Sequence, residues 1–241
     1  DDTAAVAAKY EGVRVLSTPI ASKREALRLG DEHATSFPRV YVDADVVTHV
    51  GTIRHLVEVL ASDSLLATAP RRVVPRDGVG WPVRWYYDVW ERLPNVASGL
   101  FGRGVIAVSD RGYRRLRSLP PVMSDDLAFS EAFRSGERAI VNAATVIVRP
   151  PRTLRDLLRR RMRVVTGNAQ ADGEKLRGPS ARTKMSDLSR IAVASPGFIP
   201  KVLWFVGVTV AARIGAAGAI RRGDFDTWLR DESSRSGTGA Q

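Results

Sequence analysis

The sequence predicts an α/β fold, with a mostly parallel central sheet flanked by helices and a C-terminal helical segment. Short runs of β-branched apolar residues alternate with amphipathic stretches along the first two thirds of the chain, and this alternation is typical of parallel strands joined by crossover helices. The longest apolar stretch lies near the end of the chain and predicts the final helix.

The expected elements follow in chain order from these patterns. Strands are predicted where short apolar runs are bounded by turn residues: residues 13–16, 39–43, 65–69, 105–108 and 140–148. Helices are predicted where a capping residue or helical spacing of apolar residues occurs: residues 4–9, 23–29, 48–61, 110–118 and 127–133. Loops are predicted where Gly, Pro or polar residues are dense: residues 70–82, 98–103 and 167–183.

We expect three parts along the chain: an α/β domain over residues 1–167, a helical and membrane-associated segment over 168–232, and a disordered tail over 233–241. The chain opens without an initiator Met, which suggests a missing front end. The sequence shows no signal peptide, and we expect a cytoplasmic location.

Composition limits the chemistry. The 241 residues include no Cys, which excludes a disulfide framework, a thiolate zinc site and a cysteine nucleophile. The 37 Lys and Arg against 26 Asp and Glu give a net charge of +11. Such a balance favours polyanions, anionic membrane surfaces or phosphorylated substrates as partners.

The short apolar strand 40–42 runs directly into Asp43 and Asp45, which are one residue apart. Because strand residues i and i+2 point to the same side, both carboxylates can face one point in space. Two hard oxygen ligands suit Mg²⁺ or Mn²⁺, and such an ion can neutralise a diphosphate. The alternative is an Asp-rich turn that caps the next helix.

A second acidic pair and an arginine run follow. Asp125 and Asp126 begin a predicted helix, and Arg160 and Arg163 belong to the most basic segment. A carboxylate can accept a proton from an attacking hydroxyl, and an arginine can balance the charge of a leaving diphosphate. Each group alone is also consistent with an acidic helix start or a solvated helix face.

Four motifs together resemble the inverting family 2 glycosyltransferases of the GT-A fold. They are residues 23–30, the Asp43-Ala44-Asp45 motif, the acidic pair preceded by Ser124, and the arginine segment 160–164. The resemblance covers about residues 1–167 and lacks a counterpart of the family's first strand.

The resemblance implies a nucleotide-diphosphate sugar donor and a Mn²⁺ or Mg²⁺ cofactor. Asp45 would be the main metal ligand, and Asp43 would contact the donor's ribose or assist the ion. Asp126 would be the general base that deprotonates the acceptor hydroxyl, with Asp125 the weaker candidate.

The remaining candidate residues carry over in the same way. Arg163 and Arg160 would approach the diphosphate, and Lys23 would lie on the donor side. Gly102 and Arg103 would line the donor-sugar or acceptor pocket. Trp81 belongs to an aromatic group that either packs in the core or forms a wall against sugar or lipid.

The chain departs from the family in two respects. Processive members carry Gln-x-x-Arg-Trp, whereas this chain has Arg160, Arg163 and Val164 at those positions. A single-addition transferase is therefore favoured over a polymerase. In the family, the first strand supplies much of the pocket for the nucleobase of the donor. Without that strand, the sequence does not identify the nucleobase.

The apolar core 202–212 is shorter than the roughly 20 residues that span a bilayer, which favours a buried or interfacial helix. Its basic flanks suit the inner face of a membrane and a lipid-linked or glycan acceptor. Two other readings are a nucleic-acid-binding protein and a non-catalytic membrane-surface protein of the same fold. Nucleic acid is not the expected partner, because the aromatic residues cluster apart from the arginines.

Overall fold

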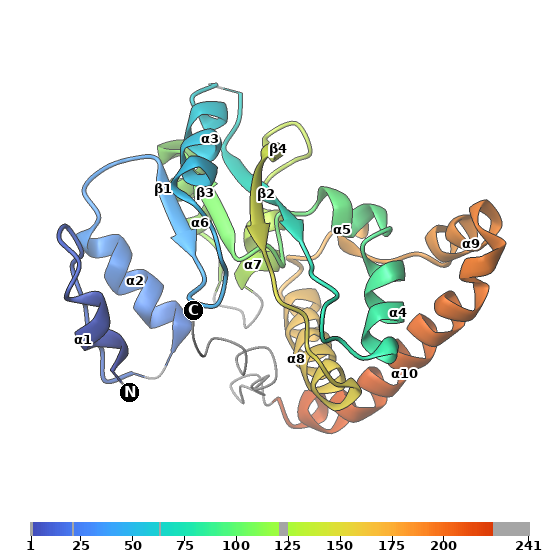
Figure 1. Cartoon of the computed structure of the whole chain (residues 1–241). Helices are drawn as coiled ribbons and strands as arrows, with labels where there is room; N and C mark the ends of the chain where they lie inside the picture. Colours follow the sequence, from blue (N-terminus) through green and yellow to red (C-terminus); the bar gives the residue numbers. More distant parts are fainter. Residues whose placement is uncertain (1, 21, 63, 121–124, 224–241) are drawn as a thin grey trace. The chain divides into compact units, whose positions relative to one another are not determined.

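The computed structural model describes residues 2–20, 22–62, 64–120 and 125–223 (Figure 1). The chain divides into two compact units, Asp1–Phe37 and Pro38–Gln241. The predicted domain boundary between residues 167 and 168 falls inside a continuous helix, α8 (Leu154–Gly173). The predicted tail, 233–241, lies outside the described residues.

The first unit contains two helices, α1 (Thr3–Ala7) and α2 (Lys23–His33). The Ser22 hydroxyl caps α2 by accepting a hydrogen bond from the Glu25 N–H at 3.4 Å. Neither helix buries a side chain. The strand predicted at 13–16 is wrong, since the described residues of this segment form no strand. An apolar run becomes a strand only where a sheet edge receives its main chain.

The second unit contains the sheet, and its strands lie in the order β1-β3-β2-β4 (Figure 1). The strands are β1 (Arg39–Val42), β2 (Ala67–Val73), β3 (Val105–Val108) and β4 (Arg138–Ile147). β3 is antiparallel to both β1 and β2, whereas β2 and β4 are parallel. Consequently β1, β2 and β4 share one direction, and β3 runs against them.

The α/β class is confirmed, but the sheet is mixed rather than mostly parallel. Among the described strands only β2 and β4 are parallel neighbours, because β3 inserts in the opposite direction between β1 and β2. Apolar patterning predicts that a strand exists and not which way it runs, so the sequence could not reveal this arrangement. The predicted loop at 70–82 also begins late, since β2 continues to Val73.

Both faces of the sheet are covered, which explains why all four residues of β3 are buried. On one face, Val105 and Ala107 pack in a cluster with Leu56 and Leu60 of α3 (Val50–Leu60). On the other face, Ile106 and Val108 pack in a cluster with apolar residues that follow or precede the strands: Leu66, Leu100, Leu116 and Phe133. The helices α6 (Asp110–Arg117) and α7 (Asp125–Glu131) flank this second cluster.

A helical layer continues from the sheet (Figure 1). It consists of α4 (Trp81–Trp90), α5 (Pro94–Ser98), α8, α9 (Met185–Ala194), α10 (Ile199–Arg222) and two short 3₁₀ turns, Pro179–Ala181 and Pro196–Phe198. α10 packs against α8 and α4. Its core contains Tyr86, Leu157, Phe205 and Val208.

α10 is longer than the apolar core 202–212 suggested. It contains 24 residues and is therefore about 36 Å long at ~1.5 Å per residue. The segment Pro196–Arg222 contains an 18-residue window with mean hydropathy 1.7, and it is long and apolar enough to cross a membrane by length and composition. Of that window, 22% is buried. Further upstream, part of the loop predicted at 167–183 is also helical, because α8 extends to Gly173.

Candidate functional site

Asp43 directly follows the last residue of β1 and begins a turn. The Val46 N–H donates to the Asp43 carbonyl at 3.4 Å, which closes residues 43–46. Asp43 is half-buried and Asp45 is exposed. The reason for expecting both carboxylates on one side, strand alternation, therefore does not apply, because the strand ends at Val42.

Asp43 and Asp126 are both hydrogen-bonded to the loop 102–104. The Asp43 N–H donates to the Gly104 carbonyl at 2.7 Å, and the Gly102 N–H donates to Asp126 Oδ2 at 2.8 Å. The Leu127 N–H donates to the other oxygen, Asp126 Oδ1, at 2.8 Å. Two acidic residues about 80 positions apart in the chain are thus anchored to one three-residue loop.

The two glycines of this loop are needed for its conformation. Gly102 and Gly104 have φ of +64° and +68°, values that side chains disfavour. A Cβ on Gly104 would lie 2.3 Å from Val46 Cγ1 and 3.4 Å from Asp43 Oδ2. The close approach of the loop to the Asp43 turn therefore requires glycine at this position.

Arg103, predicted to line a sugar pocket, is buried beneath the loop with 3% of its surface exposed. Its guanidinium donates to main-chain carbonyls: Gly99 at 2.9 Å, Pro70 at 3.0 Å, Ala97 at 2.8 Å and Val96 at 3.3 Å. Burial lowers the pKa of Arg103 to about 9, and the nearby charge of Arg72 adds to this effect. The side chain remains a cation at neutral pH and holds the loop in place.

Arg72, near the end of β2, is a second buried support of the loop. Its guanidinium donates to the Val96 carbonyl at 2.6 Å and to the carbonyls of Phe101 and Gly102 at 3.1 and 3.2 Å. It also lies 4.3 Å from the centre of the Trp90 ring, a cation–π contact. Burial lowers the pKa of Arg72 to about 10.

The arginines of α8 occupy different positions. Arg160 Nη1 donates to the Arg149 carbonyl at 3.4 Å, and its positive charge acts on Arg72, further lowering the Arg72 pKa. Arg163 is half-buried and lies one turn further along α8. Arg161 lies 5.6 Å from the Tyr86 ring. Arg160, one of the two arginines predicted to approach the diphosphate, therefore lies close enough for its charge to act on Arg72, which supports the loop.

Two predicted site residues lie away from the loop or in the other unit. Lys23 is the first residue of α2, in the first unit. Trp81 is the first residue of α4, where its ring lies 5.2 Å from Trp85 and 5.3 Å from Trp204 of α10. The loop is contacted instead by Trp90, at the other end of the same helix.

Sequence reasoning missed Arg72 and Trp90. The available signal for Arg72 was a charged residue inside the run that became β2, since charged side chains are rarely buried without a purpose. Trp90 stood among several aromatic residues, and nothing in the pattern distinguished it from Trp81.

The candidate metal site has few ligands. Within the described part of the chain, no three His, Asp or Glu side chains form a group that could hold a metal ion. Asp43 and Asp45 nevertheless fit the manner in which Mg²⁺ is often bound, through one or two carboxylates, waters and the phosphates of a substrate. Asp125 begins α7, but its side chain is outside the described part.

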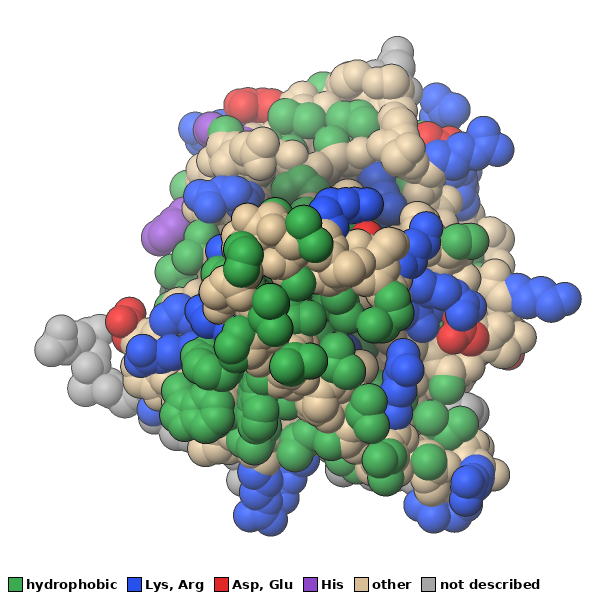
Figure 2. Space-filling model, turned by 90° about the vertical axis from the view of Figure 1, so that its right-hand side faces the viewer, with side chains coloured by type: hydrophobic (Ala, Val, Ile, Leu, Met, Phe, Trp, Pro, Cys, Tyr) green, Lys and Arg blue, Asp and Glu red, His purple; other side chains and the backbone are tan. Residues whose placement is uncertain are grey.

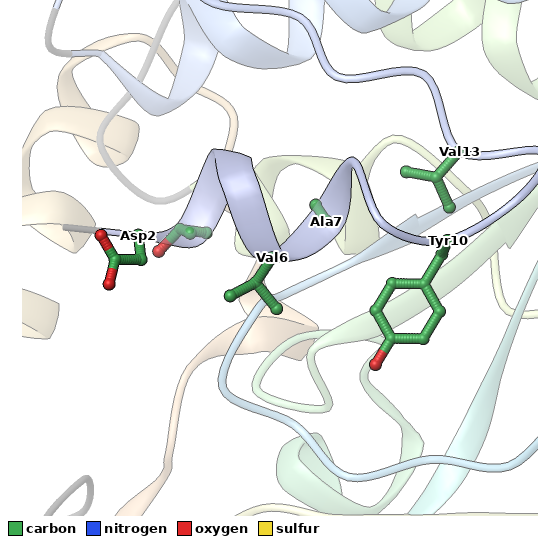
Figure 3. Close-up of a pocket in the computed structure, with 6 residues that line it drawn as sticks. Asp2, Val6, Ala7, Tyr10 and Val13 are labelled. Atoms are coloured by element: carbon green, nitrogen blue, oxygen red, sulfur yellow. The ribbon is translucent and has the colours of Figure 1, made fainter.

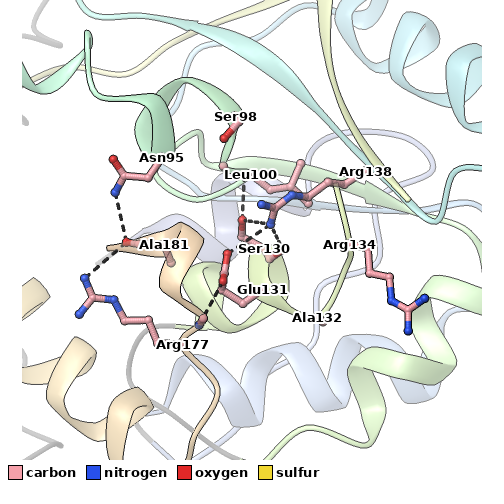
Figure 4. A network of polar contacts seen from close by, with 12 residues as sticks. Asn95, Ser98, Leu100, Ser130, Glu131, Ala132, Arg134, Arg138, Arg177 and Ala181 are labelled. Atoms are coloured by element: carbon pink, nitrogen blue, oxygen red, sulfur yellow. Dashed lines mark hydrogen bonds and ion pairs between the residues drawn. The ribbon is translucent and has the colours of Figure 1, made fainter. Parts of the chain in front are cut away.

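Two cavities lie elsewhere. One, about 1130 Å³ in volume, is lined by residues near the start of β4, at the opposite end of the sheet from Asp43. Figure 4 shows its polar network, in which Arg138 bonds Ser130 and the Gly178 N–H donates to Glu131. The other, about 590 Å³, lies in the first unit beside Val6 and Tyr10 (Figure 3). Among the residues that the structure describes, no predicted site residue lines either cavity.

Comparisons with known proteins give no assignment. No protein-family model matches this chain, and no curated protein matches it either. Function is therefore inferred from the site itself.

Proposed function

We propose that this chain is an inverting glycosyltransferase that moves a sugar from a nucleotide-diphosphate sugar to an acceptor hydroxyl. The observation that supports this most strongly is the loop 102–104, which anchors both Asp43 and Asp126. The family resemblance assigns these two residues to the donor side and to the base, and such a pair must lie close together to serve one reaction.

In this proposal Asp126 is the general base. Its carboxylate is oriented by the N–H groups of Gly102 and Leu127. It accepts the proton of the acceptor hydroxyl while the hydroxyl oxygen attacks the anomeric carbon. The bond between the anomeric carbon and the diphosphate oxygen breaks, the diphosphate leaves with the electron pair, and the configuration inverts.

Asp45 and Asp43 are the proposed ligands of Mn²⁺ or Mg²⁺, an ion that would neutralise charge on the diphosphate when bound. Arg160 and Arg163 are proposed to approach the same diphosphate, for which guanidinium groups are well suited. Arg72 and Arg103 have a different task, since their donors hold main-chain carbonyls of the loop. The mixed sheet is compatible with a GT-A domain, and we include the GT-A fold in this proposal.

The proposed acceptor is lipid-linked or a glycan, at the cytoplasmic face of a membrane. The basic net charge of +11 and the apolar α10 support this location.

Calorimetry with a panel of nucleoside diphosphates and Mn²⁺ tests the proposal. We expect one nucleotide to bind only with the metal present, and we expect Asp45→Ala to abolish binding. Asp126→Asn should bind the nucleotide but lose transfer, because the base acts on the acceptor and not on the donor. Glu58→Gln, an exposed carboxylate on α3, is the matched control and should bind as wild type does.

The proposal fails if no nucleotide binds a chain that circular dichroism shows to be folded. It also fails if binding survives both metal removal and Asp45→Ala. Sharply salt-dependent binding of any DNA or RNA, without nucleotide binding, would favour a nucleic-acid-binding protein instead.

A further inference from the structure

α10 has two apolar faces, and in the described part of the chain only one of them is covered by other elements. The inner face packs against α4 and α8 and contains Phe205, Val208, Ala212 and Ala216, all buried. The outer stripe contains Ile199, Leu203, Val210 and Ile214, which are 46%, 67%, 46% and 71% exposed. Figure 2 shows hydrophobic side chains gathered on this side of the molecule, with Lys and Arg around them. A soluble helix normally carries polar residues on its outer face.

α10 is fixed to charged helices and cannot enter a bilayer alone. Lys201 Nζ lies 2.7 Å from Asp88 Oδ2 of α4, and Trp204 Nε1 donates to the Pro82 carbonyl at 2.7 Å. On the other side lies α8, which carries a run of three arginines and a fourth two residues later. A helix that crossed the membrane in this packing would bring those charges into the hydrocarbon, which is strongly unfavourable. The packing therefore favours a helix that lies in the membrane plane.

The positive charge of α10 favours an anionic lipid surface over a second copy of the chain as the partner of the outer stripe. The helix carries Lys201, Arg213, Arg221 and Arg222, and no acidic residue occurs between positions 199 and 222. A second copy of the chain, docked symmetrically on this stripe, would bring two basic rims together. An anionic lipid surface complements the same rim, and apolar residues flanked by Lys and Arg are typical of interfacial helices.

Trp81 extends the apolar surface beside the stripe. Its side chain is 57% exposed and its ring lies 5.3 Å from that of Trp204. Tryptophan is enriched at the depth of lipid headgroups, where an apolar ring with one polar edge is favoured. The exposure of this ring fits a membrane surface.

We propose that the outer stripe of α10, with Trp81 beside it, binds the surface of an anionic lipid bilayer, the helix lying in the membrane plane. This surface needs neither a nucleotide nor a metal ion, so the proposal does not depend on the proposed transferase activity.

Vesicle flotation of the full chain tests the proposal. The chain should float with vesicles of phosphatidylglycerol and phosphatidylcholine in equal parts, and not with vesicles of phosphatidylcholine alone. Leu203→Ser combined with Ile214→Ser should weaken binding roughly tenfold or more, because both side chains would enter the interface. Val50→Ser with Val59→Ser, two exposed apolar residues of α3, is the matched control and should bind as wild type does.

Four results would overturn the proposal. One is a folded wild-type chain that does not float with anionic vesicles. Another is equal binding by the stripe variant and the α3 control variant. The third is a dimer in gel filtration that the stripe variant converts to a monomer, which would assign the stripe to a second copy. High salt should release the bound chain, and resistance to salt extraction would instead indicate a spanning helix.

Discussion

Two groups of arginines in this protein have the same chemistry and different environments. Arg72 and Arg103 are buried and donate to main-chain carbonyls around the loop 102–104. Arg114 and Arg115 of α6 lie at the surface, where they pair with Asp110 and Glu137. All four contribute equally to the net charge of +11.

The difference shows which arginines are available for a ligand. A guanidinium whose N–H groups donate to carbonyls of its own loop stabilises the fold. Burying its positive charge costs desolvation free energy. An exposed guanidinium contributes to the surface field that attracts anions. Arg103 therefore belongs to the support of the candidate site, although its position in the sequence suggested a pocket residue.

The largest expected effect is loss of a buried arginine. Arg103→Met removes the side-chain donor of the Gly99, Pro70 and Ala97 carbonyls, whereas the Val96 carbonyl keeps its hydrogen bond from Arg72. Unsatisfied buried polar groups cost about 1–3 kcal/mol each, so the free energy of unfolding should fall by about 4 kcal/mol. Arg155→Met, which removes an exposed arginine of α8, should change it by less than about 0.5 kcal/mol. Urea denaturation of both variants measures the contrast, and equal losses would contradict it.

A smaller effect is expected when the shape of a buried side chain changes and its charge is kept. Arg72→Lys keeps the positive charge, but an ammonium on a flexible stem cannot donate to Val96, Phe101 and Gly102 together. We expect a loss of about 2 kcal/mol in unfolding free energy. Arg71→Lys, the exposed neighbour on the same strand, is the control and should be neutral. A neutral Arg72→Lys would show that charge, not the fork of donors, matters here.

The smallest effect concerns a surface pair and depends on pH. Hydrogen bonds from Arg115 and from the Arg134 N–H lower the pKa of Glu137 to about 2, from its ordinary value of 4.5. The folded state binds the proton of the Glu137 carboxyl less tightly than the unfolded state does. The contribution of this ion pair to the free energy of unfolding is therefore present above pH 4.5 and is lost as the pH falls toward 2.

We expect Glu137→Gln to lower stability by at most about 1 kcal/mol at neutral pH. The gap between wild type and this variant should close as the pH falls from 4.5 to 2. Thermal melts at several pH values check this, and a gap that stays constant with pH would exclude the ion pair as its cause.

Much of the fold followed from local patterns. β3 occupies the predicted residues 105–108, and β1 ends within one residue of its predicted end. Strand direction did not follow, because β3 is defined by apolar residues that would pair equally well either way. Helix ends were misjudged where packing decides them, as in α8, whose last turns continue through Gly167 into the predicted loop.

The candidate site was predicted from the family resemblance, which assigned Asp43 to the donor side and Asp126 to the base. In the structure both residues are hydrogen-bonded to the loop 102–104, and their roles stay predictions. The burial of Arg103 could not be read from the sequence, because its partners are main-chain carbonyls, which no sequence pattern marks. The turn at Asp43 was named only as the alternative to a strand end, since Asp-x-Asp fits the end of a strand and a turn equally well.

The central claim is that the loop 102–104 builds the donor site, and Gly104→Ala tests it most directly. The added Cβ would meet Val46 Cγ1 at 2.3 Å and disfavour the φ of +68°, which displaces the Asp43 turn. Calorimetry with Mn²⁺ and the best nucleoside diphosphate should show affinity lowered roughly tenfold or more, about 1.4 kcal/mol. Gly51→Ala on α3, where a Cβ meets no atom within 4 Å, should bind as wild type does. Wild-type affinity in a folded Gly104→Ala chain would contradict the claim.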